Sequence, residues 1–395
     1  MKNKIALTAA FFAASTLSFA EIALTENLSV GGFVDMSYQH ADDDNNSLEN
    51  GGNAQPDSNN NSNYSLDQVE LNFYLDYGVV TGQIDLQWTD ANGAAVDQAF
   101  TTYDLANGFV VTAGRYDSML GFEAFEAPGL YQVSTAYTSN LTDAFSKVNP
   151  NDQAIQFGQT AAVNISNAIL PQTNNGVKVT YEDGTQFFGV SLQDGGLFGD
   201  NRLGSDSAQN NGNSAALSSI TGVNQFNLEQ SGYAVEAAYA RDLGNGFNVF
   251  VGVLMEETEV DANNNPDVET SVDTTSLNGY VTYETGAWLF AAEVVQTEME
   301  LSGAQNDIEI DSFLLMANYT YSDQASVTAR ISNVDVDNLF DATKLTAAHL
   351  YAFTDNLALA VEISSVDYDY EDVNGLGAGV DGDTLEAAVE LLFTF

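Results

Sequence analysis

Charged side chains of both signs gather in one segment of the sequence, where they could act on a passing solute. Carboxylates placed opposite a guanidinium around a water-filled constriction select ions by charge, with no bond made or broken. The constriction that we predict is built from Arg115, Asp117, Glu123 and Glu126, with Lys178 and Arg330 extending its cationic side.

Histidine chemistry has little support, because the chain holds two histidines and no cysteine. A hydrolase needs a serine–histidine pair oriented by a third group, and no local spacing provides one. His40 shortly precedes the acidic run 42–44, so an acid–histidine protease built on it stays an open alternative. His349 shares its parity with Leu345 and Tyr351, which favours a structural role. We expect no enzyme activity.

The elements that position these residues are strands. Apolar and polar side chains alternate strictly from Val69 to Tyr77, from Val80 to Thr89 and from Leu357 to Ser364. Such alternation predicts strands with one apolar and one polar face. We expect strands at about 27–39, 64–77, 79–90, 95–105, 107–116, 174–182, 185–194, 229–241, 245–257, 273–285, 286–299, 307–322, 325–336, 341–354, 356–369 and 382–395.

The links between these strands are of two kinds that largely alternate along the chain. Short ones carry turn residues, as in Ala106-Asn107-Gly108 and Gly244-Asn245-Gly246. Long ones are polar and acidic, such as 41–63 and 194–229. Short turns on one side and long loops on the other are the layout of an outer-membrane barrel, which needs an even number of strands. We predict an all-β transmembrane antiparallel barrel of about 16 strands. The strand-like piece 153–166 then belongs to a loop; a hairpin there, giving about 18 strands, is the alternative.

The two ends of the chain carry export and assembly features. Lys2 and Lys4 precede a short apolar run that ends in small residues at Ala20, which predicts a cleaved signal peptide over 1–20. Residues 21–395 then form a single barrel domain. The last strand alternates as far as Phe393 and Phe395, and this ending resembles the signal read by the outer-membrane barrel assembly machinery.

Composition limits the function further. The chain of 395 residues has 9 Lys and Arg against 56 Asp and Glu, for a formal net charge of −47. So few cations exclude nucleic acid as a partner, because phosphates would find no counter-charge. The absence of cysteine excludes a disulfide framework and thiolate metal sites. An aromatic content of 11% excludes a disordered acidic tail.

A wide barrel leaves a water-filled lumen. The side chains that we predict to line it are Asp76, Asp85, Glu236, Glu293, Arg330 and Glu362. Segment 117–173 is the longest link and is richer in apolar residues than the other loops, with Met119, Leu120, Phe122, Phe125, Leu130 and Tyr131. We therefore expect this segment to fold inward and narrow the lumen.

Short motifs resemble the OmpL-like β-barrel porins, more clearly in the N-terminal half of the chain. They are Ser29-Val30-Gly31-Gly32-Phe33-Val34-Asp35, then Ala113-Gly114-Arg115-Tyr116 followed by Leu120-Gly121-Phe122-Glu123, and Leu170-Pro171 with Gly176-Val177-Lys178. The resemblance implies an outer-membrane porin with passive transport and names no substrate.

These features predict passive diffusion of small hydrophilic solutes and ions, with cations favoured by acidic side chains. Outer-membrane lipid, lipopolysaccharide and the barrel assembly machinery are the expected partners, and homotrimers are usual among such porins. A non-conducting barrel with an adhesive or structural role is the alternative, and a barrel hydrolase a weaker one.

No cofactor or dedicated metal site is expected. The run 261–269 is similar to a calcium loop, but Pro266 replaces the required Gly and Val272 the final Glu. Loose association of Ca²⁺ or Mg²⁺ with acidic loops such as 42–44, bridging lipopolysaccharide, is a hypothesis.

Overall fold

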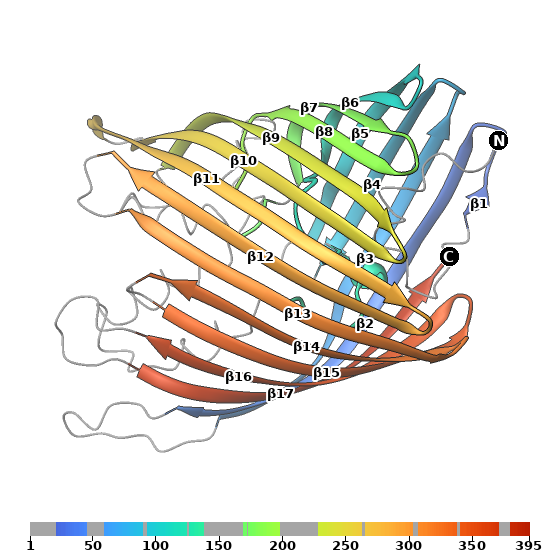
Figure 1. Cartoon of the computed structure of the whole chain (residues 1–395), viewed down its shortest axis with the longest axis vertical. Helices are drawn as coiled ribbons and strands as arrows, with labels where there is room; N and C mark the ends of the chain where they lie inside the picture. The colour runs from blue at the N-terminus through green and yellow to red at the C-terminus, as the bar shows by residue number, and fades with distance from the viewer. Residues whose placement is uncertain are drawn as a thin grey trace.

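The strands close into a single antiparallel barrel (Figure 1). The computed structural model describes residues 21–45, 59–89, 93–124, 126–137, 169–171, 173–197, 228–262, 265–302, 307–337, 340–370 and 380–395. The predicted signal peptide, the piece 153–166 and Phe125 lie outside the described residues. Among the described residues, no helix is long and apolar enough to cross a membrane.

Sixteen strands, β2 to β17, make up the barrel wall. They are β2 (Leu28–Asn45), β3 (Asn59–Asp76), β4 (Val80–Thr89), β5 (Gly93–Ala106), β6 (Phe109–Asp117), β7 (Thr173–Glu182), β8 (Gln186–Gln193), β9 (Leu228–Gly244), β10 (Phe247–Ala262), β11 (Asn265–Thr285), β12 (Trp288–Leu301), β13 (Ile308–Ser322), β14 (Ala325–Val336), β15 (Phe340–Thr354), β16 (Leu357–Tyr370) and β17 (Val380–Thr394). The two-residue β1 (Ile22–Ala23) pairs with β2, and a single 3-10 turn, η1, spans Ala127–Gly129.

Pairing of β17 with β2 closes the barrel. Strand β6 pairs directly with β7, so no further hairpin enters the wall between them. The sixteen-strand prediction is confirmed and the eighteen-strand alternative is wrong.

The outer wall is apolar at the height expected for lipid. Residues such as Val294, Leu315, Leu345 and Ile363 are at least half exposed, as they must be on a surface that lipid covers. Near the short turns, aromatic rings pair across strands: the ring centroids of Phe247 and Tyr283 lie 4.2 Å apart, and those of Trp288 and Tyr319 4.5 Å apart. Such rings form the girdle at a membrane interface. In barrels with short turns at one end and long loops at the other, the long loops are external, and the end of this barrel that carries the long loops is called here the external end.

The interior is divided into an apolar side and a polar side. Over β9 to β16, the inward positions hold a hydrophobic cluster. Its members include Leu254, Val272, Tyr280, Leu289, Val295, Met299, Ile310, Leu314, Val334 and Tyr368. Over β2 to β5 the buried inward side chains are mainly polar, as at Asp35, Glu70, Asn72 and Asp85. Polar side chains such as Ser276, Asn278 and Thr297 share the inward positions of β9 to β16 with this cluster.

The described parts of segment 117–173 lie inside the barrel and explain this division. Residues 118–124, 126–137 and 169–171, called here the inner loop, contact the interior of the wall, where Leu120, Phe122 and Ile169 join the hydrophobic cluster. Leu130 and Tyr131 are also buried, and Met119 packs against the cluster. The inner faces of β9 to β16 thus form a packed interface with the loop, which leaves the side of β2 to β5 for the predicted water-filled lumen.

Candidate functional site

Three wall carboxylates hold the inner loop by accepting its donors. Glu236 on β9 accepts the Ser118 hydroxyl at 2.7 Å and the Met119 backbone N–H at 2.6 Å. Glu362 on β16 accepts the backbone N–H groups of Val133 at 2.8 Å and Ser134 at 2.9 Å.

Glu293 on β12 is the third of these carboxylates. It accepts the Phe122 backbone N–H at 2.8 Å and the Tyr137 hydroxyl at 2.9 Å. Burial, with the nearby Glu293 charge, raises the pKa of Tyr137, which keeps its hydroxyl a donor. The three acids face the interior as predicted, but all are buried beneath the loop. Their charge is used to bind loop donors and is not open to water.

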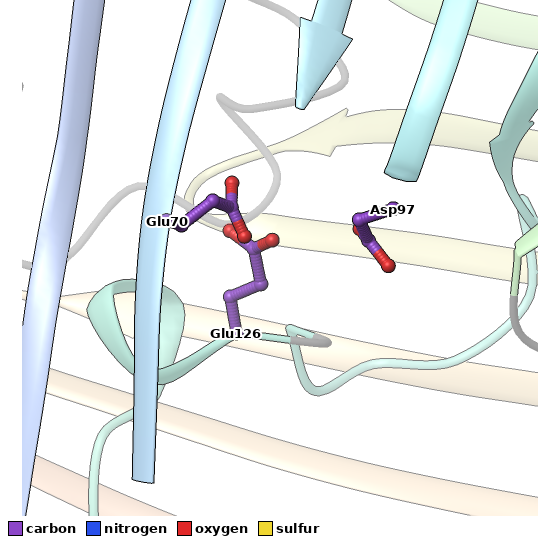
Figure 2. A group of neighbouring side chains, drawn as sticks. All are labelled: Glu70, Asp97 and Glu126. Carbon is purple, nitrogen blue, oxygen red and sulfur yellow. The ribbon is translucent and has the colours of Figure 1, made fainter. Parts of the chain in front are cut away.

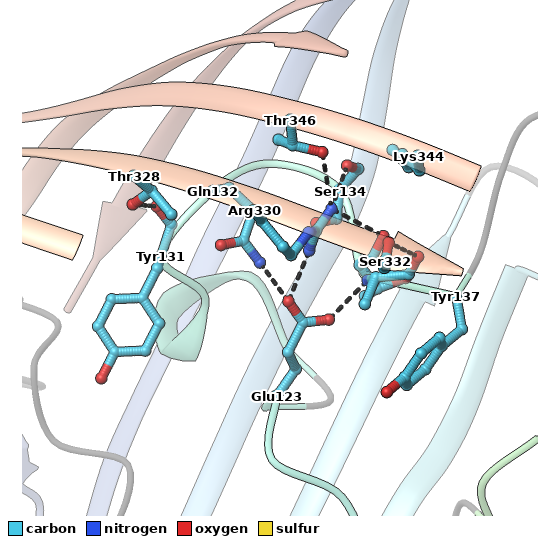
Figure 3. A network of polar contacts seen from close by, with 12 residues as sticks. Glu123, Tyr131, Gln132, Ser134, Tyr137, Thr328, Arg330, Ser332, Lys344 and Thr346 are labelled. Atoms are coloured by element: carbon cyan, nitrogen blue, oxygen red, sulfur yellow. Dashed lines mark hydrogen bonds and ion pairs between the residues drawn. The ribbon is translucent and has the colours of Figure 1, made fainter. Parts of the chain in front are cut away.

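Arg330 and Glu123 form the centre of a second attachment (Figure 3). An Arg330 nitrogen on β14 lies 2.5 Å from a Glu123 carboxylate oxygen, and the two side chains are 0% and 9% exposed. The guanidinium also donates to the backbone carbonyls of Ser134 at 2.9 Å and Thr135 at 3.1 Å. The other Glu123 oxygen accepts the Ala136 backbone N–H at 2.6 Å. Arg330 therefore fastens the loop to β14 instead of lining open water.

Glycines in the wall make room for the start of the inner loop. A Cβ atom on Gly189 would lie 2.3 Å from the Met119 sulfur, and one on Gly252 would lie 2.1 Å from a methyl carbon of Leu120. These distances are far below van der Waals contact, so each position has space for the loop only without a side chain.

The polar side of the lumen carries a group of carboxylates, Glu70, Asp85, Asp97 and Glu126, called here the acidic wall. Figure 2 shows Glu70 of β3, Asp97 of β5 and Glu126 of the inner loop, and one carboxylate oxygen from each lies within 4.8 Å of the others. Asn72 donates to Asp85 at 2.8 Å and also to Glu70, which ties β3 to β4. The bulge in the β4–β5 register lies between Ile84 and Leu86, opposite Asp97.

Glu126 holds a proton within this group. Burial, a hydrogen bond to Glu70 and the charges of Glu70, Asp117 and Asp97 raise the pKa of Glu126 to about 11. At neutral pH the side chain is therefore uncharged and joins Glu70 through a shared proton.

The predicted pairing of Glu123 and Glu126 with a cationic side is found for one of the two acids. Glu123 pairs with Arg330, which belongs to the predicted cationic side, whereas Glu126 lies among acids. Among the described residues, no ion pair joins Arg115 to either acid. Arg115 Nε donates to the Asp97 carbonyl oxygen at 2.7 Å. Asp117 accepts the Thr173 hydroxyl at 3.0 Å and anchors the point where the loop leaves β6. Of the cations in the described structure, Arg115 is the one that lies at the edge of the acidic wall.

Other cations of the described interior are also engaged. Lys178 donates to the Asp117 carbonyl oxygen at 3.3 Å and lies 4.3 Å from the centre of the Tyr116 ring. Lys344 lies 3.7 Å from Glu386. Within the described strands, no lysine or arginine stands opposite the acidic wall as the predicted cationic face would require.

Asp76 lies at the short-turn end, where it is exposed. Its carboxylate accepts the Gly78 backbone N–H at 2.8 Å. The side chain caps the β3–β4 turn at the end of the strand, and its predicted role in lining the lumen stays a prediction. Asp85 keeps its predicted inward position.

Local sequence patterns did not predict two side-chain contacts of the structure. Glu256 on β10 accepts the backbone N–H groups of Gly196 at 2.9 Å and Leu197 at 2.7 Å, so the loop after β8 also turns inward. His40 Nδ1 lies 2.8 Å from the Ser62 hydroxyl across β2 and β3. This pair is exposed, and no third group among the described residues orients the ring. Cross-strand register, which local spacing does not reveal, creates both contacts.

The C-terminus is part of the wall. Phe395 donates its backbone N–H to the Gly32 carbonyl at 3.0 Å, and Gly32 donates to the Phe395 carbonyl at 2.9 Å. The rings of Phe393 and Phe395 stack at 5.9 Å. The last residue therefore helps to close the barrel.

Comparisons with known proteins identify the fold of the chain. No protein-family model and no curated protein match the chain. Among solved structures, the outer-membrane channel DcaP of Acinetobacter baumannii is 12% identical with a TM-score of 0.56, covering 95% of this chain and 100% of that one. The anion-selective porin from Comamonas acidovorans is 14% identical with a TM-score of 0.54, covering 93% and 99%. OmpT of Vibrio cholerae, an outer-membrane protein, is 11% identical with a TM-score of 0.54, covering 95% and 100%.

At these identities the likeness concerns the fold alone. The chain has the sixteen-stranded barrel fold of outer-membrane porins. The narrower resemblance to OmpL-like porins has no matching family model and stays a prediction.

Proposed function

We propose that this chain is an outer-membrane channel through which small hydrophilic solutes and ions diffuse passively. A closed sixteen-stranded wall, apolar outside, suits a bilayer. The inner loop fills the apolar side of the lumen and leaves the acidic wall along the remaining passage. Such a loop narrows a diffusion channel without sealing it.

The channel favours cations. The observation that carries this proposal is the acidic wall. Arg115 lies at its edge, and the other described interior cations are bound to loop, carbonyl or carboxylate groups elsewhere. In a narrow passage with low-dielectric walls, one sign of fixed charge raises the local concentration of counter-ions. The fold does not determine whether a channel prefers cations or anions, because the Comamonas acidovorans porin, which has the same fold, is described as anion-selective.

Planar-bilayer recordings in a salt gradient test both parts. We expect a conductance with a reversal potential of cationic sign, and a shift toward zero in the double variant Asp85→Asn/Asp97→Asn. Asp183→Asn is the matched control, because this exposed carboxylate lies in the β7–β8 turn, away from the wall. A reversal potential of anionic sign would refute the selectivity, and absence of conductance would refute the channel.

The remaining features of the proposal concern location and assembly. A signal peptide over 1–20 would export the chain, and the assembly machinery would read Phe393 and Phe395. One similar structure is titled as a trimer form of OmpT, and we propose a homotrimer here also. No catalytic role is proposed, because the His40–Ser62 pair has no orienting third group in the described structure.

A further inference from the structure

Two buried acids lie inside the barrel where the last strand closes on the first. Asp35 on β2 and Glu390 on β17 are each 6% exposed. The β17–β2 register pairs Asp35 with Leu392 and Glu390 with Ser37, so the two acids are diagonal neighbours across the closing pair of strands. Diagonal positions are about 7–8 Å apart, which long side chains can span. The two carboxylates therefore share one region of the interior.

A β-bulge adds a third acid to this region. The β2–β3 register shifts after Asp35 and leaves Asp67 as the extra residue of β3. Bulges redirect a side chain, and this one brings Asp67 close enough for its charge, like that of Asp35, to act on Glu390. Asp67 is partly exposed and connects the group to the water of the lumen. Asp35, Asp67 and Glu390 are called here the seam acids.

The seam acids are not compensated by the protein. Neither ion pair of the described interior, at Arg330 or at Lys344, includes a seam acid. Asp35 Oδ1 is buried and accepts no hydrogen bond. Thr394, the other diagonal neighbour of Asp35 on β17, is 0% exposed, and its hydroxyl has no partner either. Buried polar atoms are nearly always satisfied, so these two atoms indicate a partner from outside the chain.

The acidic wall differs in this respect. Gln68 donates to Glu70 at 3.0 Å, Asn72 donates to Glu70 and Asp85, and Glu126 carries a proton. Those acids are therefore compensated from within the chain, whereas the seam acids are not.

Charge and space indicate the kind of ligand. Buried carboxylates need a counter-charge, and a region closed at Asp35 and Glu390 admits a small ion more readily than an organic cation. The seam acids gather less tightly than Glu70, Asp97 and Glu126, whose oxygens lie within 4.8 Å of one another. Ca²⁺ suits such an open set, because it takes about 6–8 oxygen ligands in a flexible arrangement that includes water, whereas Mg²⁺ demands a near-ideal octahedron.

We propose that the seam acids bind a Ca²⁺ ion that fastens the last strand of the barrel to the first. Asp35 and Glu390 bind it from the two closing strands, and Asp67 binds it from the bulge of β3. Water from the lumen completes the ligand shell. The ion offsets the repulsion among three acids and stabilises the closed barrel, which is a role separate from conduction.

Calcium binding and thermal unfolding of the full-length chain in detergent test the site. The chain is treated with EDTA, exchanged into chelator-free buffer at neutral pH and titrated with Ca²⁺ by calorimetry. We expect saturable binding and a higher Tm with Ca²⁺ than with EDTA, since a ligand of the native state stabilises it. The double variant Asp35→Asn/Glu390→Gln should bind Ca²⁺ at least about tenfold more weakly, because ligand charge sets the affinity of such sites. In EDTA the variant should have a higher Tm than the parent, because two buried like charges are gone.

Matched controls separate this site from the other acids. Asp383→Asn removes an exposed acid on the outer face of β17, and Asp97→Asn removes an acid of the acidic wall. Both should keep the parent affinity and the stabilisation by Ca²⁺. Each variant is checked for the heat-sensitive gel migration of a folded barrel, and Asp35→Asn alone replaces the double variant if that does not fold.

Three results would overturn the proposal. Loss of Ca²⁺ binding in Asp97→Asn or Asp383→Asn, with binding retained in Asp35→Asn/Glu390→Gln, would assign the ion to another group of acids. Equal Tm of the parent with Ca²⁺ and with EDTA would exclude a stabilising ion. A parent that gains stability on mild acidification and not with Ca²⁺ would show that protons neutralise the seam acids.

Discussion

Replacing Arg330 by Met should release part of the inner loop from the wall. Arg330 is fully buried and binds Glu123 at 2.5 Å and two loop carbonyls within 3.1 Å. The variant leaves Glu123 buried without its partner, and breaking a buried ion pair in this way costs about 3–5 kcal/mol. At about 1.4 kcal/mol per factor of ten, the released state gains about two to three and a half orders of magnitude in population.

Release would be local, because Glu236, Glu293 and Glu362 still hold other parts of the loop. Single-channel recording measures the effect: we expect Arg330→Met to show more open-channel noise and a second, larger conductance level than the parent. The double variant Glu123→Gln/Arg330→Met removes both charges and should recover part of the parent behaviour. Identical conductance and noise in Arg330→Met and the parent would refute the view that this ion pair fastens the loop.

Two more predictions concern the inner loop. The pKa of Glu126 is raised from its ordinary 4.5 to about 11, so the proton that stabilises the fold is fully bound below the ordinary value and is lost as pH rises toward 11. Glu126→Gln should therefore gain thermal stability over the parent with rising pH, and parallel stability–pH curves would contradict this. Gly252→Val should push Leu120 aside and cost about 1–3 kcal/mol. Thermal unfolding measures this cost, with Gly279→Ala, whose added Cβ meets its nearest atom at 3.7 Å, as the control; equal losses in both would contradict it.

Strand positions could be predicted from sequence because a wall with lipid on one side imposes strict alternation. The predicted strand at 325–336 coincides with β14, and that at 307–322 begins only a residue before β13. Strand ends in the long polar links were less predictable: β2 and β3 run on to Asn45 and from Asn59, well past the predicted 39 and 64. There, backbone pairing continues beyond the lipid, where apolar alternation is no longer needed.

The site was only partly predictable, since alternation says which side chains point inward but not what covers them. Glu293 and Glu362 point inward as expected, yet their partners, Phe122 and Val133, lie 171 and 229 residues away in sequence. No local pattern contains contacts of that range. Sequence offered three cations for Glu123, namely Arg115, Lys178 and Arg330, and the choice of Arg330 depends on the path of the loop across the lumen.

The net charge of −47 does not by itself set the ion preference. The buried carboxylates of Glu236, Glu293 and Glu362 accept hydrogen bonds from the inner loop. The carboxyl group of Glu126 carries a proton at neutral pH. Acids on the outer face of the strands lie across the wall from the lumen, and salt screens charges beyond about 10 Å. Within the acidic wall, Glu70 and Asp85 are fully buried and Asp97 is partly exposed, so Asp97 is the member that a permeating ion can meet directly. Ion preference therefore depends on a few side chains on the polar side of the lumen and not on the net charge of the whole chain.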